Sequence, residues 1–393
     1  MKTTHRLFFA DARKMAAVAD ESVDLVVTSP PYPMIAMWDE IFRNADPQID
    51  KALSQQDGGR AFELMHRRLD PVWGEVFRVL KTGGFACINI GDAVRTLKDR
   101  FTLYPNHVRI LGYLYEKGFN LLPAVIWRKQ TNAPNKFMGA GMLPAGAYVT
   151  LEHEYILIVR KGDKRTFEAG PERQTRRESA FFWEERNLWF SDVWMDVKGA
   201  RQKIQDKTLR HRSGAFPIDV PYRLINMYSV AGDTILDPFT GSGTTLAAAA
   251  AAGRNSIGYE IDAGFNDAIA LRMENSVALA RILVNERLGT HREFVQKRTA
   301  EKGPLKHSNA YYGFPVMTAQ EKSLRLPLAC RVRRIASDVF EADYEDGSGG
   351  MDTNEKSNDV AAADSGEQCR EDKLIAENRR PVGRAMIQRF LFE

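Results

Sequence analysis

Short apolar runs alternate along the chain with longer segments that are amphipathic or built from small residues. Short β-branched runs bounded by turn residues are typical of strands, whereas apolar residues recurring every three or four positions are typical of helices. The runs predict strands at residues 5–10, 23–27, 85–90, 120–127, 154–159, 234–236 and 255–259. The longer segments predict helices at residues 61–80, 104–117, 244–252 and 263–288, one beginning at Pro221 and a short one after Asp11. This succession of strands and helices is that of an α/β protein.

The predicted strand 23–27 runs into the sequence Thr28-Ser29-Pro30-Pro31-Tyr32. Two successive prolines cannot donate ladder hydrogen bonds and fix their own φ, so the strand has to end there. A stiff loop then presents a hydroxyl, two carbonyls and an aromatic ring at the strand's carboxyl end, where ligands sit in open α/β sheets. These groups suit a planar base gripped by its amino group and one face. A tetrapeptide of this kind, taken alone, is also compatible with a plain turn and a packed tyrosine.

A second polar loop follows the predicted strand 234–236 and reads Asp-Pro-Phe-Thr-Gly-Ser-Gly-Thr-Thr over residues 237–245. Its glycines let backbone amides approach a ligand closely, and the next helix presents its positive end. A P-loop would need Lys and then Ser or Thr after the last glycine, and a nicotinamide fingerprint would need a third glycine; neither is present. Glu260 ends the next predicted strand, at a spacing that fits an acid holding two ribose hydroxyls.

Together the two loops resemble the amino-directed DNA methyltransferases. In that family the catalytic loop is Asp, Asn or Ser followed by Pro-Pro and an aromatic residue, and the cofactor loop has the Asp-Pro-Phe and glycine pattern seen here. The catalytic loop comes first, which resembles the circularly permuted β group. The resemblance implies a doubly wound, mostly parallel, seven-stranded Rossmann-like sheet with S-adenosyl-L-methionine as cofactor. It implies a catalytic role for Ser29, Pro30, Pro31 and Tyr32. It implies cofactor binding by Asp11, Asp237, Pro238, Phe239, Gly241, Ser242, Gly243, Thr244 and Glu260.

Three further residues are open to two interpretations each. Asp11 matches an acidic position of the family near the cofactor's adenine or the target base, but alone it is typical of a helix N-cap. Asn89 and Asp92 follow the predicted strand 85–90. From there they could reach the cleft or merely cap the next element.

The resemblance also suggests a domain organisation. Residues 1–160 would form the catalytic half, 161–212 an inserted target-recognition segment, 213–297 the cofactor-binding half and 298–342 a C-terminal extension. The segment 161–212 interleaves basic with aromatic residues, which suits phosphates and bases, although a solvated face explains any single charge. We expect DNA contacts from Arg173, Arg176, Arg177, Lys198, Arg201 and Lys203. Residues 343–393 carry few apolar side chains up to about residue 380, which predicts a partly disordered tail.

The bulk composition is that of an ordinary globular protein, with 44% hydrophobic and 27% charged residues. The net charge of +4 is compatible with a polyanionic partner but too weak to imply one. No apolar stretch approaches the ~18 residues of a membrane span, and a signal-peptide apolar region is absent. Cys87, Cys330 and Cys369 have neither metal-ligand nor disulfide spacing. We therefore expect a cytoplasmic protein without metal or membrane association, whose partner is double-stranded DNA.

The target atom remains open between alternatives. Carbon-5 methylation of cytosine would need a cysteine in the catalytic loop, and none lies near it. In the family, serine in the first motif position goes mostly with cytosine N4 and aspartate mostly with adenine N6. Ser29 therefore favours site-specific cytosine-N4 methylation, in a restriction-modification system or as an epigenetic mark. Adenine N6 is the first alternative and an inactive DNA-binding homologue the second; RNA or protein amines are further substrates, and a separate restriction endonuclease is a possible partner.

Overall fold

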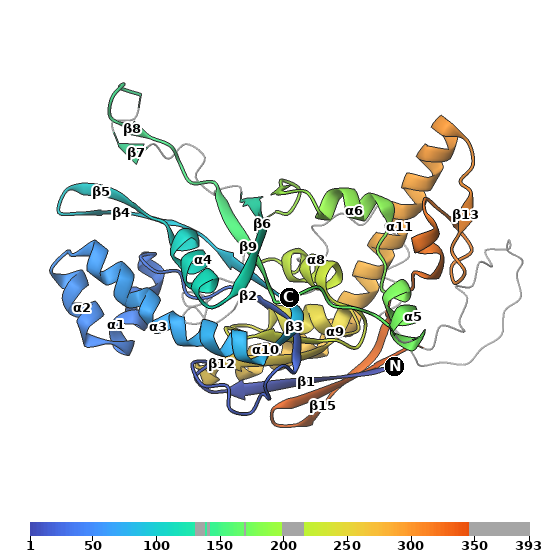
Figure 1. Cartoon of the computed structure of the whole chain (residues 1–393), viewed down its shortest axis with the longest axis horizontal. Coiled ribbons are helices and arrows are strands. Elements are labelled where there is room, and N and C mark those ends of the chain that lie inside the picture. The colour runs from blue at the N-terminus through green and yellow to red at the C-terminus, as the bar shows by residue number, and fades with distance from the viewer. Residues whose placement is uncertain (130–137, 140–141, 169, 199–215, 346–393) are drawn as a thin grey trace, which may run out of the picture.

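The computed structural model describes residues 1–345 except 130–137, 140–141, 169 and 199–215. Within that part of the chain, a ten-stranded sheet carries helices on both faces (Figure 1). Its strand order is β10-β6-β9-β3-β2-β11-β12-β1-β16-β15. The strands are β1 (Lys2–Phe9), β2 (Val23–Thr28), β3 (Leu80–Ile90), β6 (Phe119–Arg128), β9 (His153–Lys161), β10 (Val193–Trp194), β11 (Thr234–Asp237), β12 (Asn255–Glu260), β15 (Ala329–Ala336) and β16 (Val339–Tyr344).

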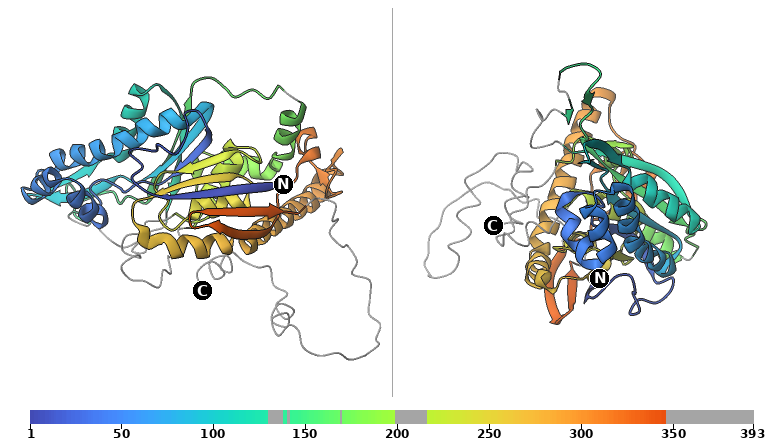
Figure 2. Two further views of the ribbon diagram at one scale, coloured as in Figure 1. Left: turned by 90° about the horizontal axis from the view of Figure 1, so that it is seen from below. Right: turned by 90° about the vertical axis from the view of Figure 1, so that its left-hand side faces the viewer.

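Strands β3, β2, β11, β12 and β1 run parallel at the centre of the sheet, and β9 and β6 follow as an antiparallel pair. These are the seven strands that the sequence predicts, and the α/β class with a mostly parallel sheet is confirmed. The predicted number of strands is too low, because β10 extends one edge of the sheet and the hairpin β15–β16 extends the other. Figure 2 shows that hairpin lying alongside β1.

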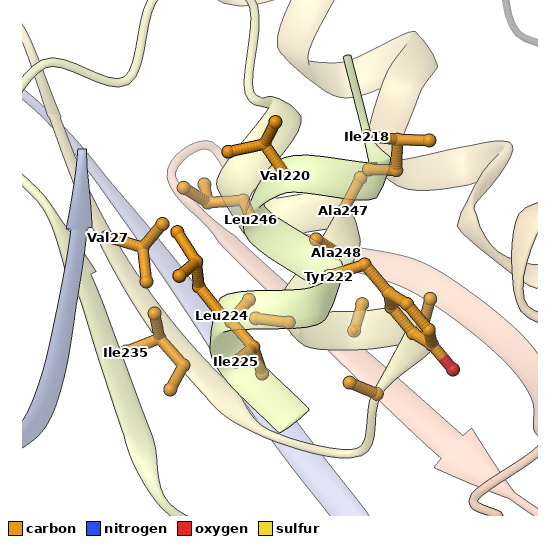
Figure 3. Close-up of a cluster of buried hydrophobic side chains, with 14 of the residues drawn as sticks. Val27, Ile218, Val220, Tyr222, Leu224, Ile225, Ile235, Leu246, Ala247 and Ala248 are labelled. Carbon is orange, nitrogen blue, oxygen red and sulfur yellow. The ribbon is translucent and has the colours of Figure 1, made fainter. Parts of the chain in front are cut away.

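Each face of the sheet is covered by its own set of helices. The side chain of Val26 packs into the cluster that contains α3 and α4, whereas Leu25 and Val27 pack into the cluster that contains α8, α9 and α11. Figure 3 shows α8 wedged between β2, β11 and α9 in the second cluster. Because β2 is buried on both faces, the consecutive residues Leu25, Val26 and Val27 are all apolar instead of alternating with polar ones. The helices are α1 (Asp39–Ala45), α2 (Pro47–Ser54), α3 (Gly58–Val79), α4 (Asn106–Glu116), α5 (Gly170–Glu178), α6 (Trp183–Trp189), α8 (Asp219–Tyr228), α9 (Thr244–Ala251), α10 (Asn266–Glu274) and α11 (Ser276–Lys302).

Shorter elements complete the described part. They are the hairpins β4 (Ala93–Leu97)–β5 (Arg100–Tyr104) and β7 (Met138–Gly139)–β8 (Ala147–Tyr148), the pair β13 (His307–Ser308)–β14 (Pro315–Val316), and the 3₁₀ turns η1 (Ala36–Trp38), η2 (Ala263–Phe265) and η3 (Ala319–Ser323). None of the helices in the described ranges is long and apolar enough to cross a membrane.

Three sequence predictions about elements need correction. The segment after Asp11 forms turns rather than a short helix, because Asp11 binds the backbone of Arg13 locally. The helix predicted at 263–288 is divided at Asn275 into α10 and α11, and α11 continues to Lys302. Strand β16 ends at Tyr344, two residues inside the tail predicted to be disordered, because it pairs with β1 and β15. The remainder of that tail lies outside the described residues.

Candidate active site

The two polar loops lie side by side at one rim of the sheet. Strands β2 and β11 are parallel neighbours, with Leu25 opposite Ile235 and Val26 opposite Leu236, so both carboxyl ends reach the same edge. Thr28 Oγ1 donates a hydrogen bond of 2.6 Å to Asp237 Oδ1 and joins the two loops directly. Loops more than 200 residues apart in the sequence therefore meet at one rim of the sheet.

A cleft of about 1120 Å³ opens where the loops meet. It is lined by Asp11 after β1, by the catalytic loop, by the glycine loop and by the end of β12. Met37, Trp38 and Ile41 of the η1–α1 segment form an apolar wall. Nine of the residues predicted from sequence line it: Asp11, Ser29, Pro31, Asp237, Pro238, Phe239, Gly241, Thr244 and Glu260. Pro30, Tyr32, Ser242 and Gly243 belong to the same loops but do not line the cleft.

The catalytic loop is held by a hydrogen-bond network from β3 and β9. Tyr32 Oη donates to Glu154 Oε2 at 2.9 Å and accepts from Asn89 Nδ2 at 2.8 Å. Asn89 Nδ2 also donates to Glu154 Oε2 at 2.7 Å, and Lys129 Nζ donates to Glu154 Oε1 at 2.8 Å. Burial, and then the Glu154 charge, raise the pKa of Tyr32 well above its ordinary value, so the phenol keeps its proton.

This network fixes the direction of the hydrogen bond between Ser29 and Tyr32, whose oxygens are 3.1 Å apart. A tyrosine hydroxyl has one proton, and that of Tyr32 is donated to Glu154. Ser29 must therefore be the donor toward Tyr32. Once its own proton is engaged, Ser29 Oγ has only lone pairs left for a ligand in the cleft. The loop thus presents Ser29 as a hydrogen-bond acceptor, which is what an amino group requires.

The glycine loop is shaped by left-handed glycines and by Glu260. Gly241 and Gly243 have φ values of 51° and 83°, which glycine adopts without strain. Glu260 Oε2 accepts the Gly241 N–H at 2.7 Å, and its Oε1 accepts the Asp262 N–H at 2.9 Å. Burial raises the pKa of Glu260. The carboxylate therefore ties the loop to the end of β12 from the wall of the cleft.

The loop has room for a bound ligand. A Cβ atom built on Gly241 would meet nothing within 4 Å, so the space beside this glycine is open. Ser242 Oγ is buried and has no hydrogen-bond partner among the described residues. The glycine loop, Glu260 and the apolar wall therefore fit a cofactor that combines a polar amino-acid end with a nucleoside.

The remaining predicted cofactor residues are held by local partners. Asp237 is buried, which raises its pKa to about 6, and it also accepts the Phe239 N–H at 3.0 Å. Asp11 is ion-paired with Arg13, whose hydrogen bonds lower the pKa of the Asp11 carboxyl. Thr244 Oγ1 accepts a hydrogen bond from Arg272 of α10. The N-cap interpretation of Asp11 is wrong, because turns rather than a helix follow it. Asp11 lines the cleft, and its contact with a cofactor or base stays a prediction.

The basic residues predicted to contact DNA are not brought together. Arg173, Arg176 and Arg177 lie on α5, and they line a groove that includes Asp24 at the amino end of β2, the edge opposite Ser29. Figure 1 shows α5 and α1 at opposite ends of the molecule. Lys198 is exposed and follows β10. Trp194 of β10 pairs with Trp127 near the carboxyl end of β6, so Lys198 lies toward the rim of the sheet that carries the cleft. Arg201 and Lys203 lie outside the described residues.

Sequence reasoning missed two residues of this network, Glu154 and Lys129. Asn89, which the sequence predicts to reach the cleft or to cap the next element, does not line the cleft; it donates a hydrogen bond to Tyr32 of the adjoining loop. Asp92, the other polar residue after β3, instead caps α4 by accepting the His107 N–H at 3.1 Å. Glu154 stands at the beginning of β9, and β9 runs antiparallel to β3. The signal that could have found it was the rule that an antiparallel strand begins at the rim where its parallel neighbours end.

Thr28→Val should destabilise the fold, because Val preserves the shape of Thr28 but removes one hydrogen-bond donor from the buried Asp237 carboxyl. The expected loss is about 1–3 kcal/mol in the free energy of unfolding. Urea-induced unfolding measures it. Thr96→Val, at an exposed position of β4, is the matched control and should change stability by less than about 0.5 kcal/mol. A Thr28→Val loss no larger than the control's would show that the bond does not hold the two loops together.

Comparisons with known proteins agree with this geometry. A family model described as DNA methylase matches residues 23–271. The Type II methyltransferase M.MthZI of Methanothermobacter thermautotrophicus is 49% identical over 347 residues, covering 88% of this chain and 96% of the relative. The Type II methyltransferase M.MjaI of Methanocaldococcus jannaschii is 49% identical over 271 residues, covering 66% of this chain and 88% of the relative. A Thermus thermophilus protein, a candidate DNA modification methylase solved with S-adenosyl-L-methionine, superposes with a TM-score of 0.55 at 32% identity, covering 69% of this chain and 95% of that one.

The fold and the site thus define an α/β methyltransferase. The chain belongs to the N6/N4 DNA methylase family, whose model covers both polar loops. S-adenosyl-L-methionine is the cofactor of this family, and the open space beside Gly241 fits it. Among the described residues, no group of three or more His, Cys, Asp or Glu side chains is placed to hold a metal ion.

Proposed function

We propose that this chain is a site-specific DNA methyltransferase that modifies the exocyclic amine of a flipped-out base, with cytosine N4 as the target. The observation that carries the proposal is the Thr28–Asp237 hydrogen bond, because it places Ser29 and the glycine loop in one cleft. An amine acceptor and a methyl-donor site have to share such a space for direct transfer. A base inside a duplex cannot enter the cleft, so the target nucleotide has to leave the stack.

In this mechanism the chain's residues position the amine and stabilise the charge that develops on it. S-adenosyl-L-methionine supplies an electrophilic methyl group when bound. Ser29 Oγ and the Pro30 carbonyl accept the two N–H bonds of the amine, which draws its nitrogen toward tetrahedral geometry and favours the forming ammonium. The ring of Tyr32, which is half-buried next to the cleft-lining Ser29, is the proposed stacking surface for the flipped base. Holding the nitrogen in line lowers the entropic barrier. The ammonium is acidic after transfer, so no side chain has to remove a proton beforehand.

Tyr32 cannot move freely in this scheme. Its hydroxyl is bound to Ser29, Asn89 and Glu154, and a Cβ on Gly91 would lie 3.1 Å from its ring. The glycine at position 91 therefore lets the tyrosine ring sit against the backbone. This restraint keeps the ring near the Ser29 hydroxyl, so that base stacking and amine binding occur in one place.

Ser29 in the first motif position supports cytosine N4 over adenine N6, although both amines present the same two donors to the loop. The expected result is N4-methyldeoxycytidine in plasmid DNA incubated with the protein and isotopically labelled cofactor. Nucleoside mass spectrometry with synthetic standards measures the product. Labelled N6-methyldeoxyadenosine would instead establish the adenine alternative. The absence of any labelled nucleoside, with cofactor binding intact, would overturn the DNA-methylating function.

A further inference from the structure

A second groove, of about 1290 Å³, lies at the amino edge of the sheet, away from the cleft. Its floor includes Asp24 of β2 and Tyr228 of α8, and its walls come from α5, α6 and η3. Arg165 is anchored here, with its Nη1 atom 2.7 Å from Asp233 Oδ2. Trp183 and Phe190, which line the groove, are 40% and 41% exposed. The groove is therefore a surface feature with a fixed base and partly uncovered aromatic rings.

The lining of the groove carries an excess of positive charge. Eight basic residues line it against two acidic residues, Asp24 and Glu321, both of which are buried. Arg165 pairs with Asp24 and Asp233. The seven other basic residues of the lining have no ion pair within the described ranges: Arg160, Lys164, Arg173, Arg176, Arg177, Arg186 and Lys322. Glu172 and Glu178 of α5 offset only part of this excess. Such a surface attracts an extended acidic partner.

The chain's own continuation begins beside this groove. The Glu345 carbonyl accepts from Arg325 Nη2 at 3.2 Å, and the Arg325 N–H is bound to the carbonyl of Glu178 at 2.9 Å. Arg325 thus contacts both Glu345, the last described residue, and Glu178, the last residue of α5, so the two lie close in space. The sequence that follows, residues 346–377, contains nine acidic and three basic residues. It therefore carries the charge opposite to that of the groove.

We infer that the acidic segment 346–377 of this chain occupies the groove at the amino edge of the sheet, against the arginines of α5. The 32 residues of the segment span up to about 3.3–3.6 Å each when extended, so reach is not limiting. Because the segment belongs to the same chain, its effective concentration at the groove is high; for short flexible linkers it is in the millimolar range. The groove opens on the edge opposite Ser29, so a duplex with a base in the cleft does not need this surface.

Chemical protection of the α5 arginines in the full-length protein tests this assignment. Phenylglyoxal modifies accessible guanidinium groups, and peptide mass spectrometry reports Arg173, Arg176 and Arg177 together with exposed Arg60 of α3 as an internal reference. The comparison protein is a full-length variant with the nine acids of 346–377 replaced by Asn or Gln. The matched control replaces Lys356, Arg370 and Lys373 by Gln, which leaves the acids in place.

The α5 arginines should react several-fold more slowly in the native chain and in the matched control than in the neutralised variant, with Arg60 unchanged. Raising the salt to about 1 M should abolish the protection in the native chain, because the Debye length falls to about 3 Å. The salt comparison uses the native chain alone, so it does not depend on whether a variant folds. Equal reactivity in the native and neutralised proteins, or no response to salt, would overturn the inference. Protection of the native chain only after a duplex oligonucleotide is added would assign the groove to DNA.

Discussion

Ser29→Ala should lower kcat by about 10²–10³-fold while leaving the dissociation constant for S-adenosyl-L-methionine unchanged. The variant removes one preorganised group aimed at the charge that develops on the amine, and a loss of this size is typical of such groups. Cofactor affinity should persist because the glycine loop is organised by Glu260 and Thr28–Asp237 rather than by Ser29. Single-turnover methylation and isothermal titration with the cofactor measure the two effects separately.

Tyr32→Phe is the matched control for Ser29→Ala. It keeps the ring and the Ser29 hydroxyl but removes the oxygen that accepts the Ser29 proton. Ser29 can then rotate and donate into the cleft, so we expect a smaller loss than for Ser29→Ala and again no loss of cofactor affinity. If Ser29→Ala keeps normal turnover, the serine does not accept the amine. If it loses turnover and cofactor affinity together, the residue belongs to the cofactor site instead.

The sequence was sufficient for the two loops because their conformations are decided locally. Pro30 and Pro31 end β2 whatever surrounds them, and Gly241 and Gly243 can adopt positive φ values that other residues resist. The apolar runs before each loop are buried on both faces, which gave a strong strand signal. Since both runs lie in a parallel sheet, their carboxyl ends had to reach the same rim. The local chemistry and the fold class together therefore predicted the cleft.

The sequence was not sufficient where tertiary pairing decides the position of a side chain. Glu154 reaches Tyr32 only because β9 is antiparallel to β3, and nothing in the residues around Glu154 announces that pairing. The arginines of α5 have the composition of a DNA contact, yet the same antiparallel strand delivers the chain to the opposite edge of the sheet. Composition describes what a segment can bind, whereas strand direction decides where it lies.

Edge strands were the other failure of prediction. Strand β15 is mostly exposed, β16 alternates buried and half-buried positions, and β10 contains two residues, so none of them gave a continuous apolar run. Their places depend on unsatisfied backbone groups of β1 and β6, which any strand can pair with. A wider sheet than predicted therefore changes the edges of the fold but leaves the central strands and the cleft in place.

Glu260→Ala should weaken cofactor binding by about 10–10²-fold, with a much smaller effect on kcat at saturating cofactor. The side chain accepts the Gly241 and Asp262 N–H groups and lines the cleft, so its removal frees the glycine loop and deletes the acceptor proposed for the ribose hydroxyls. Hydrogen bonds to a charged group contribute roughly 1.5–3 kcal/mol each, and about 1.4 kcal/mol corresponds to tenfold in affinity. Isothermal titration with S-adenosyl-L-methionine measures the change.

Glu260→Gln separates the two roles of this side chain. The amide keeps one acceptor oxygen and the size of the side chain, but its NH₂ group cannot accept the second backbone N–H. If Glu260 acts mainly on the ribose, the Glu260→Gln variant should retain part of the affinity for S-adenosyl-L-methionine. It should bind adenosine more weakly than the native chain does, but it should bind 2′,3′-dideoxyadenosine as well as the native chain does. If it acts only by holding the loop, both nucleosides should lose affinity alike. A binding isotherm unchanged in Glu260→Ala would remove this residue from the cofactor site altogether.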